Sequence, residues 1–378
     1  MAKYRLGDIA PVCQGMVADS NQCWLLNLDV VESNTGKILE YVYVDHSQIG
    51  ASTVSFDKMN VLYSKLRPYL NKVVLPDRAG YATSEMLPLR PNEQVITREY
   101  LTYFLRSPHF VKYINGKTSG AKMPRANIAD LKAVEIECPS IMEQNRITTQ
   151  FDLITRVIEK RQKELSTFDN LIKARFVELF GDPVSNPKGW EKKALSEEAE
   201  IRIGPFGSLL HKEDYIIGGH ALINPSHIVN GKITPDDKLT ISDEKYDELS
   251  AYHLKKGDVV MGRRGEMGRC AVVEQAGLLC GTGSLLIRTN GDLSADYIQK
   301  IISFPSFKKT IEEMAVGQTM PNLNVPIVSA FQIIKPPKSV QDQYYAFVAQ
   351  TDKSKAQVQK SLNETQLLFD SLMQKYFG

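Results

Sequence analysis

Three residues of this 378-residue chain could hold a metal ion and activate water, namely Asp236, Asp243 and Lys245. In metal-dependent nucleases, carboxylate oxygens bind the cation and a lysine can steady the attacking water. Here the carboxylates are closely spaced beside a polar turn, and the first half of the chain has no counterpart. We therefore interpret the cluster as accidental, and we expect no magnesium-dependent cleavage by the purified chain.

Other catalytic and metal-binding patterns are incomplete. Residues 281–284, Gly-Thr-Gly-Ser, resemble a phosphate-binding loop but lack the later glycine and lysine of a P-loop. The six histidines and five cysteines show neither the H-E-x-x-H nor the C-x-x-C spacing of zinc ligands. The sequence also lacks a G-x-S-x-G elbow and the Pro-Pro-aromatic loop that grips an amino group in adenine methylation. It therefore predicts a chain that is not an enzyme by itself, with no metal site and with reduced, mostly buried cysteines.

Basic residues gather in stretches that contain no acidic residue. Residues 105–127 hold five cations and residues 60–72 hold three, although the net charge of the whole chain is only +2. The second half carries a glycine-rich loop with three arginines at 261–269, in a place equivalent to 63–71. A solvent-exposed face explains any single basic stretch. It does not require the equivalent loop to be basic in both halves of the chain. The recurrence favours surfaces that meet the phosphate backbone of a nucleic acid.

Candidate contact residues lie in these loops and in two others. Residues 204–208 offer open backbone and an aromatic side chain, and arginine is the commonest bidentate reader of guanine in the major groove. Loops at 122–127 and 318–324 place amide and cationic groups after a glycine. A structural alternative for this repeated loop is that its Met-Pro and Asn cap the segment entering the last strand. The candidate DNA contacts are Lys65, Arg67, Lys72, Lys122, Arg125, Phe206, Ser208, Arg263, Arg264, Arg269, Gln318, Thr319 and Asn322.

The basic loops belong to an internal duplication of the chain. The motif Met-Pro-x-x-Asn begins at Met123 and again at Met320, an offset of 197 residues (320 − 123). The same offset relates Tyr100 to Tyr297. A protein that doubles a unit this large doubles a surface, so we expect a partner that also presents two sites.

Each copy is predicted to consist of a mixed α/β part followed by a long helix. The mixed parts are residues 1–140 and 182–338, and the helices are residues 141–181 and 339–378. Turn and periodicity signals predict short strands and two shorter helices within the mixed parts. The strands are predicted at 61–63, 73–75, 258–261, 271–273 and 284–287, and the shorter helices near 97–115 and 294–315.

An apolar stripe predicts that the two long helices pair. Seam positions recur at alternating steps of four and three over more than four heptads, the spacing of a coiled coil. A helix over 147–179 is about 50 Å long at 1.5 Å per residue, and it cannot bury its own stripe. We expect its duplicate to pair with it antiparallel within one chain; the alternative is a dimerisation coiled coil between two chains. The predicted seam residues are Ile147, Phe151, Ile154, Ile158, Leu165, Phe168, Ile172, Leu179, Tyr344, Val348, Val358, Leu362, Phe369, Leu372 and Tyr376.

The composition is that of an ordinary globular protein, with 43% hydrophobic and 24% charged residues. No apolar run approaches the roughly 18 residues that span a bilayer, and the first residues show no apolar signal core. The sequence therefore predicts a cytoplasmic protein with no membrane partner.

Duplicated α/β domains, each followed by a long helix with proline near its start and Phe-Gly at its end, resemble the specificity subunit of type I restriction-modification enzymes. The marks here are the two Met-Pro-x-x-Asn loops, helix starts at 143–144 and 342–343, and helix ends at 180–181 and 377–378. The helix starts differ by 199 rather than 197 residues. This predicts a two-residue slip there, that is, a shift of two residues in the alignment of the two halves. The resemblance covers essentially the whole chain. It implies an α+β fold with two pseudo-symmetric α/β target-recognition domains, joined by two long antiparallel helices that form an intramolecular coiled coil.

The resemblance also implies a function. Each mixed domain would recognise one half of an asymmetric, bipartite sequence in double-stranded DNA, and the paired helices would fix the gap between the halves. Two modification subunits would dock on the helices and supply S-adenosylmethionine binding and adenine methylation. Two restriction subunits, with ATP and Mg²⁺, would join them in complexes that cleave DNA, while this chain would bind no cofactor. The alternative hypothesis is a non-catalytic two-domain scaffold that binds proteins and is indifferent to salt.

Overall fold

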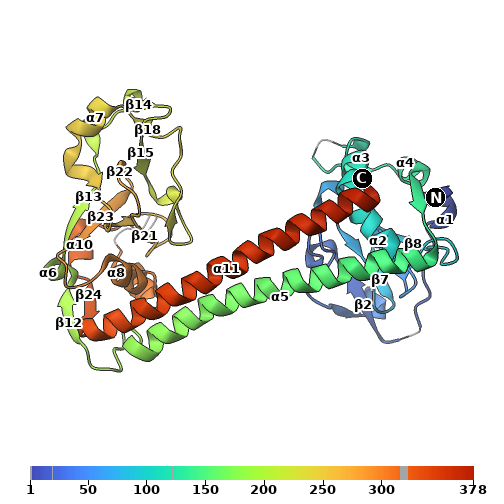
Figure 1. The fold of residues 1–378 in the computed structure, drawn as a ribbon, viewed down its shortest axis with the longest axis horizontal. Helices are drawn as coiled ribbons and strands as arrows, with labels where there is room; N and C mark the ends of the chain where they lie inside the picture. Colours follow the sequence, from blue (N-terminus) through green and yellow to red (C-terminus); the bar gives the residue numbers. More distant parts are fainter. Residues whose placement is uncertain (1, 19, 121, 316–321) are drawn as a thin grey trace. The chain divides into compact units, whose positions relative to one another are not determined.

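The computed structural model describes residues 2–18, 20–120, 122–315 and 322–378, without the side chain of Ser208. The chain divides into two compact units. Unit 1 comprises Met1–Ser166 with Ala356–Gly378, and unit 2 comprises Thr167–Lys355. Each unit holds one mixed α/β domain and a part of both long helices (Figure 1).

The domain of unit 1 is built from short strands, short helices and single 3₁₀ turns. Its elements are β1 (Ala2–Arg5), α1 (Leu6–Ile9), β2 (Gln22–Leu26), η1 (Leu28–Val30), β3 (Tyr43–Asp45), η2 (His46–Gln48), β4 (Thr53–Phe56), β5 (Val61–Ser64), η3 (Pro68–Leu70), β6 (Val73–Val74), β7 (Gly80–Thr83), β8 (Met86–Leu89), α2 (Arg98–Arg106), α3 (Pro108–Asn115), β9 (Thr118–Ser119), β10 (Arg125–Ala126), α4 (Ile128–Ala133) and β11 (Glu135–Cys138). One sheet has the order β3-β2-β7-β4 and another the order β6-β5-β8, while β1 pairs with β11 and β9 with β10. Strands β5 and β8 are buried along their whole length, so they form the centre of the domain.

The domain of unit 2 has the same plan, with one more strand in each of the two larger sheets. Its elements are β12 (Glu191–Ala194), α6 (Leu195–Glu198), β13 (Ala199–Ile203), η4 (Gly207–Leu209), η5 (Lys212–Asp214), β14 (Tyr215–Ile216), β15 (His220–Ile223), η6 (Pro225–His227), β16 (Ile228–Val229), β17 (Lys232–Ile233), β18 (Thr240–Ile241), α7 (Asp243–Glu248), η7 (Ser250–Tyr252), β19 (His253–Leu254), β20 (Val259–Gly262), β21 (Cys270–Val272), β22 (Leu278–Cys280), β23 (Ser284–Thr289), α8 (Ala295–Ile302), α9 (Pro305–Met314), α10 (Val325–Ser329) and β24 (Gln332–Lys335). The sheets have the orders β13-β23-β20-β21 and β14-β18-β15-β22-β19, with β16 paired to β17. Strand β12 pairs with β24 as β1 pairs with β11, so both domains close on the strand that precedes a long helix.

Each predicted shorter helix is in fact two helices, so the single helices predicted near 97–115 and 294–315 are wrong. Pro108 is the first residue of α3 and Pro305 is the first residue of α9. Proline lacks the N–H that would continue a preceding helix, but it fits the first turn of a new one. The Ser107 hydroxyl also caps α3 by accepting the N–H of Phe110 at 3.2 Å. These local signals override the apolar periodicity that runs through both helices.

The long helices are α5 (Ile141–Phe180) and α11 (Lys338–Phe377), each of 40 residues. All the seam residues predicted from the sequence are buried or half-buried. Helix α5 ends before Gly181, whose φ of +77° lies in the left-handed region that glycine adopts readily at a helix end. Helix α11 is followed by the same residue type, Gly378.

The two-residue slip predicted at the helix starts is wrong. Helices α5 and α11 begin 197 residues apart (338 − 141). The equivalent residues are Gln144 and Gln341, which are both fully buried and also 197 apart. The Gln144 amide donates to the Pro139 carbonyl at 2.9 Å, and the Gln341 amide donates to the Pro336 carbonyl at 3.1 Å. Residues 342–343 are similar in sequence to residues 143–144. The buried glutamine side chain nevertheless shows that Gln341 is the equivalent of Gln144.

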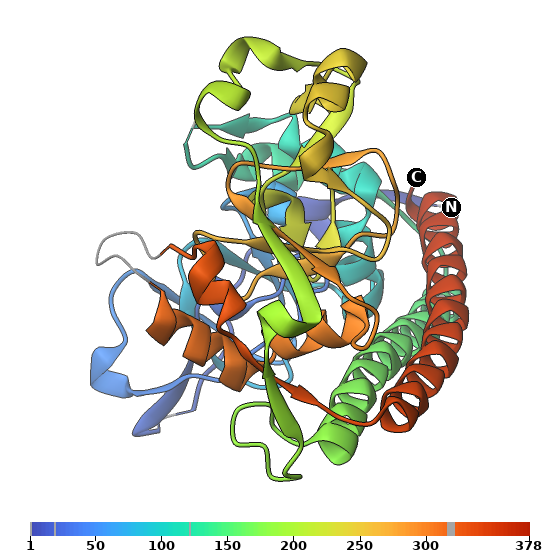
Figure 2. The same ribbon diagram turned by 90° about the vertical axis from the view of Figure 1, so that its left-hand side faces the viewer.

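Side-chain contacts show that the long helices run antiparallel within the chain. In unit 1, Arg161 of α5 donates to the Ser361 carbonyl of α11 at 2.6 Å. In unit 2, Lys355 of α11 lies 2.6 Å from the Asp169 carboxylate of α5. From residue 161 to residue 169 of α5, the partner in α11 moves back from 361 to 355, so the helices run in opposite directions, side by side as in Figure 2. The coiled coil is intramolecular, as expected for the α+β fold with two pseudo-symmetric domains.

The end of each long helix docks on a domain through a matched pair of rings. In unit 1, Phe377 packs on Tyr100 with ring centroids 5.0 Å apart, and in unit 2 Phe180 packs on Tyr297 at the same separation. Both phenylalanines and both tyrosines are buried. The duplicated residues seen in the sequence are therefore the anchors that join each domain to a helix end.

Alanine in place of Arg288 is expected to destabilise unit 2 by about 2 kcal/mol. The Asp258 carboxylate is only 2% exposed, and Arg288 donates to both of its oxygens at 2.8 and 2.7 Å. The loss is moderate because the carboxylate keeps the N–H of Lys255, 2.7 Å away. Denaturant unfolding measures the change, and adding Asp258→Asn should recover part of it. Unchanged stability in the single variant would contradict this account of the ion pair.

Candidate nucleic-acid interface

In unit 1 the two basic loops that the sequence singled out are hydrogen-bonded to each other. The N–H of Arg67 donates to the Pro124 carbonyl at 2.7 Å, and the N–H of Ala126 donates to the Lys65 carbonyl at 2.8 Å. We call residues 64–67 and 122–127 the first loop pair. The pairing brings Lys65, Arg67 and Arg125 onto adjacent backbone, with Lys122 exposed on the turn between β9 and β10.

One acidic residue, Glu85, contacts the first loop pair from outside it, and the sequence pattern did not indicate it. Glu85 accepts hydrogen bonds from Nε and Nη2 of Arg125 at 3.0 and 2.8 Å, and its other oxygen is 3.9 Å from the Lys65 ammonium. These hydrogen bonds raise the pKa of Arg125. Glu85 lies outside the acid-free stretches, so no local pattern could have marked it.

Lys72 is turned away from the first loop pair. Its ammonium donates to the Leu28 carbonyl at 2.5 Å, and partial burial lowers the pKa of Lys72. This contact ties the end of the basic loop to the η1 turn. We therefore leave Lys72 out of the interface and assign it a structural role.

Unit 2 repeats the same backbone arrangement. The N–H of Leu323 donates to the Arg263 carbonyl at 2.9 Å, and Arg264 forms a β-bridge with Asn322. We call residues 262–265 and 322–324 the second loop pair. The Arg263 guanidinium donates from Nε to the Asn322 side chain at 3.1 Å. Burial and the neighbouring Arg264 cation lower the pKa of Arg263, and the Arg264 side chain is exposed.

Two glycine-rich segments adjoin the second loop pair. The N–H of Arg263 donates to the Gly283 carbonyl at 3.0 Å, and the N–H of Gly204 donates to the Ser284 carbonyl at 3.1 Å. The loop at 204–208 therefore lies beside the segment at 281–284, and its Phe206 ring is 63% exposed. The segment at 281–284, which lacks the residues of a P-loop, serves here as a connector between two candidate loops. Gln318 and Thr319 lie outside the described residues, as does the side chain of Ser208.

The Arg269 guanidinium is hydrogen-bonded to other groups of the protein. It donates to the Glu266 carboxylate at 3.2 and 2.7 Å and to the Pro225 carbonyl at 3.1 Å. Hydrogen bonds from Arg269 and Lys308 lower the pKa of Glu266, which therefore stays ionised at neutral pH. This network braces the far end of the glycine-rich loop.

The asparagine of each Met-Pro-x-x-Asn motif caps a helix. Asn127 accepts the N–H of Ala129 at 2.9 Å, and Asn324 accepts the N–H of Ile327 at 2.9 Å. The structural alternative considered for these loops therefore applies to the asparagines, which start α4 and α10. Arg125 and Asn322, which lie between the proline and the asparagine of each motif, remain candidates for contact.

The acidic cluster considered for metal chemistry is not assembled. Asp243 lies 3.0 Å from His220, and Lys245 lies 2.9 Å from Glu248. Asp236 accepts the N–H of Lys238 in its own turn. Among the described residues, no group of three or more His, Cys, Asp or Glu side chains could hold a metal ion.

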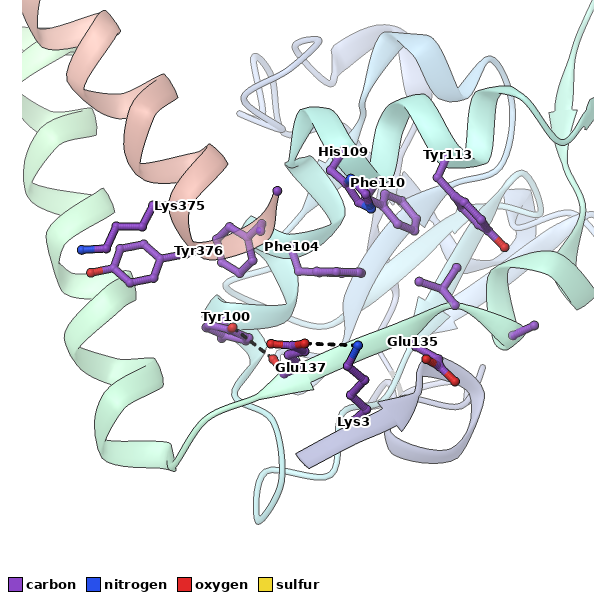
Figure 3. A pocket seen from close by; sticks show the side chains of 14 residues that line it. Lys3, Tyr100, Phe104, His109, Phe110, Tyr113, Glu135, Glu137, Lys375 and Tyr376 are labelled. Atoms are coloured by element: carbon purple, nitrogen blue, oxygen red, sulfur yellow. Dashed lines mark hydrogen bonds and ion pairs between the residues drawn. The ribbon is translucent and has the colours of Figure 1, made fainter. Parts of the chain in front are cut away.

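The cavity drawn in Figure 3 lies where the end of α11 meets the first domain, and its volume is about 460 Å³. Lys3 and Glu137 form an ion pair of 3.3 Å across β1 and β11, and Tyr100 donates to the Glu137 carbonyl. His109 and Tyr113 lie on the opposite rim in this view. The side chains brace strands and helix ends, so we assign this cavity to the anchoring of α11.

The sequence and the fold of the chain are similar to those of known proteins. The family described as "Type I restriction modification DNA specificity domain" matches residues 1–167 and 187–365. The specificity subunit of the type I restriction enzyme MjaIX from Methanocaldococcus jannaschii is 22% identical over 370 residues, covering 89% of this chain and 82% of that protein. The S subunit of a type I system from M. genitalium has a TM-score of 0.57 at 15% identity, covering 100% and 96% of the two chains. A chain from a study of assembly and conformational transition in the type I R-M system has a TM-score of 0.67 at 18% identity, covering 100% and 97%.

Two loop-bearing α/β domains and an antiparallel pair of long helices define a recognition protein built by internal duplication. The chain belongs to the type I restriction modification DNA specificity family. It is thus a specificity subunit with two target-recognition domains, and this role is recognition rather than catalysis. In the described part of the chain, no helix is long and apolar enough to cross a membrane.

Proposed function

We propose that each domain recognises one half of a bipartite, asymmetric sequence in double-stranded DNA. The observation that carries this proposal is the duplicated loop pair, in which the same two segments are hydrogen-bonded in both units and carry cations. Cationic loops supply the phosphate contacts that position a protein on DNA, and arginine and amide groups supply base readout. The proposed contacts are Lys65, Arg67, Lys122, Arg125, Phe206, Ser208, Arg263, Arg264, Gln318, Thr319 and Asn322.

The proposed partners are two modification subunits, joined by two restriction subunits in complexes that cleave DNA. S-adenosylmethionine, ATP and Mg²⁺ would then belong to those partners. Leu171 and Leu368 support a doubled docking surface, because they are 197 residues apart and both about half exposed on the long helices. Helices α5 and α11 contribute to both units, and we propose that they set the number of base pairs between the half-sites.

Alanine in place of Arg264 should weaken or relax recognition of one half-site only, by roughly fivefold to a hundredfold at the affected position. The test is selection of bound duplexes from a random DNA pool by the full-length chain, followed by sequencing. Lys353→Ala provides a matched control, since Lys353 is an exposed cation on α11, outside both loop pairs. Equal loss at both half-sites would contradict modular recognition.

A further inference from the structure

The two loop pairs each hold one arginine by its Nε, but the arginine comes from opposite loops. In unit 1 it is Arg125, held by Glu85, and in unit 2 it is Arg263, held by Asn322. Position 125 corresponds to 322 and position 65 to 263, at offsets of 197 and 198. The unit 2 arginine therefore occupies the place of Lys65, while an asparagine occupies the place of Arg125.

The acidic residue that accepts hydrogen bonds from the arginine in unit 1 has no counterpart in unit 2. The N–H of Lys65 donates to the Glu85 carbonyl at 2.9 Å, just as that of Arg263 donates to the Gly283 carbonyl at 3.0 Å. Glu85 and Gly283 are therefore equivalent, at an offset of 198. A Cβ at Gly283 would lie 2.9 Å from Pro225 Cδ, so unit 2 has no room for an acidic side chain there.

An arginine whose Nε already donates a hydrogen bond can still donate two parallel hydrogen bonds from its terminal nitrogens. Each terminal nitrogen carries two hydrogens, so the Nη1 and Nη2 pair can meet O6 and N7 of guanine even when one hydrogen is engaged. Arg125 engages Glu85 through Nε and Nη2 and the Met123 carbonyl through Nη1 at 3.3 Å. These contacts fix the plane of the guanidinium, which lowers the ordering cost of a bidentate contact.

We propose that Arg125 and Arg263 each recognise a guanine, one in each half-site, and that Glu85 and Asn322 are the residues that position them. This inference rests on the proposed function and adds the base class that each domain selects. Glu85 has a second effect that Asn322 lacks, because its negative charge opposes binding to the phosphate backbone. Positioning and charge can therefore be separated experimentally.

The experiment is sequence selection from a random duplex pool by the full-length chain, followed by affinity measurements on the selected duplex and on one that lacks the site. Arg125→Ala and Glu85→Ala should each lower the preference for guanine at the same position of one half-site, by about tenfold. Arg263→Ala and Asn322→Ala should do the same in the other half-site. Replacing that guanine with 7-deazaguanine, which lacks N7, should weaken the unaltered chain but not the matching arginine variant.

Charge variants distinguish positioning from damage to the fold. Glu85→Ala should tighten binding to DNA that lacks the site while it relaxes the guanine preference, whereas structural damage would weaken both. Asn322→Asp should keep the preference, since the carboxylate still accepts from Arg263. Lys122→Ala, an exposed cation on the same hairpin, should weaken binding to all sequences alike.

Four results would overturn the inference. One is a selected motif without a guanine that depends on Arg125 or Arg263, and another is loss of all binding in both Glu85→Ala and Glu85→Gln. The third is a chain that selects no sequence from the pool, which would overturn the proposed function as well. Sequence selection that survives both arginine substitutions would overturn the guanine assignment alone.

Discussion

Alanine in place of Phe151 is expected to lower the free energy of unfolding of unit 1 by about 4 kcal/mol. The ring is fully buried, stacks on Tyr103 at 4.8 Å and meets Phe369 and Phe377 at 5.2 and 5.9 Å. Its neighbours come from α2 and α11, so the cavity left behind would open the contact that joins the domain to both long helices. The reason for the large effect is lost burial together with a cavity that rigid aromatic neighbours cannot fill.

Denaturant unfolding followed by tryptophan fluorescence can assign this loss to unit 1. Of the two tryptophans in the chain, Trp24 lies in unit 1 and Trp190 in unit 2. The transition reported by Trp24, in a chain that carries Trp190→Phe, should move to lower denaturant. Phe206→Ala is the control, because an exposed ring should change stability by less than about 0.5 kcal/mol. Equal effects of the two substitutions would contradict the packing described for Phe151.

DNA affinity is expected to fall steeply as salt rises. Each phosphate neutralised by a lysine or arginine contributes a slope of about −0.9 in the logarithm of affinity against the logarithm of salt concentration. If four phosphates are neutralised, raising salt from about 50 to 200 mM should weaken binding roughly a hundredfold. The exposed cations Arg67 and Lys122 are the first candidates for these contacts.

Fluorescence anisotropy with a labelled duplex measures this slope directly. Lys122→Ala should reduce its size by about one, and Lys353→Ala should leave it unchanged. Binding indifferent to salt would contradict the DNA interface and would favour the protein-binding scaffold instead.

The duplication was visible in the sequence because matched loops, anchors and helices recur at a nearly constant offset. The apolar stripe predicted the two long helices, and the Met-Pro-x-x-Asn repeat marked both loop pairs. The sequence could not show that the two loops are hydrogen-bonded to each other. Residues 65 and 126 are distant along the chain and meet only in the folded domain. The structure adds this pairing.

Two features of the candidate site could not be seen in the sequence, and the physical reason is the same for both. A sequence gives the charge of a side chain but not its direction, so Lys72 was grouped with cations although its ammonium meets a backbone carbonyl. Glu85 was overlooked for the same reason, since it reaches Arg125 from a different strand connection. The break before Pro108 was predictable from a local signal, because serine followed by proline starts a helix.

A domain exchange tests the central claim most directly. Residues 182–338 would be replaced with the equivalent segment of a relative, and the sequences selected from a random duplex pool would be compared with those of the unaltered chain. We predict a motif of two specified halves around an unspecified gap, in which the exchange changes one half and leaves the other half and the gap intact. A single contiguous motif, or a change in both halves, would contradict the account.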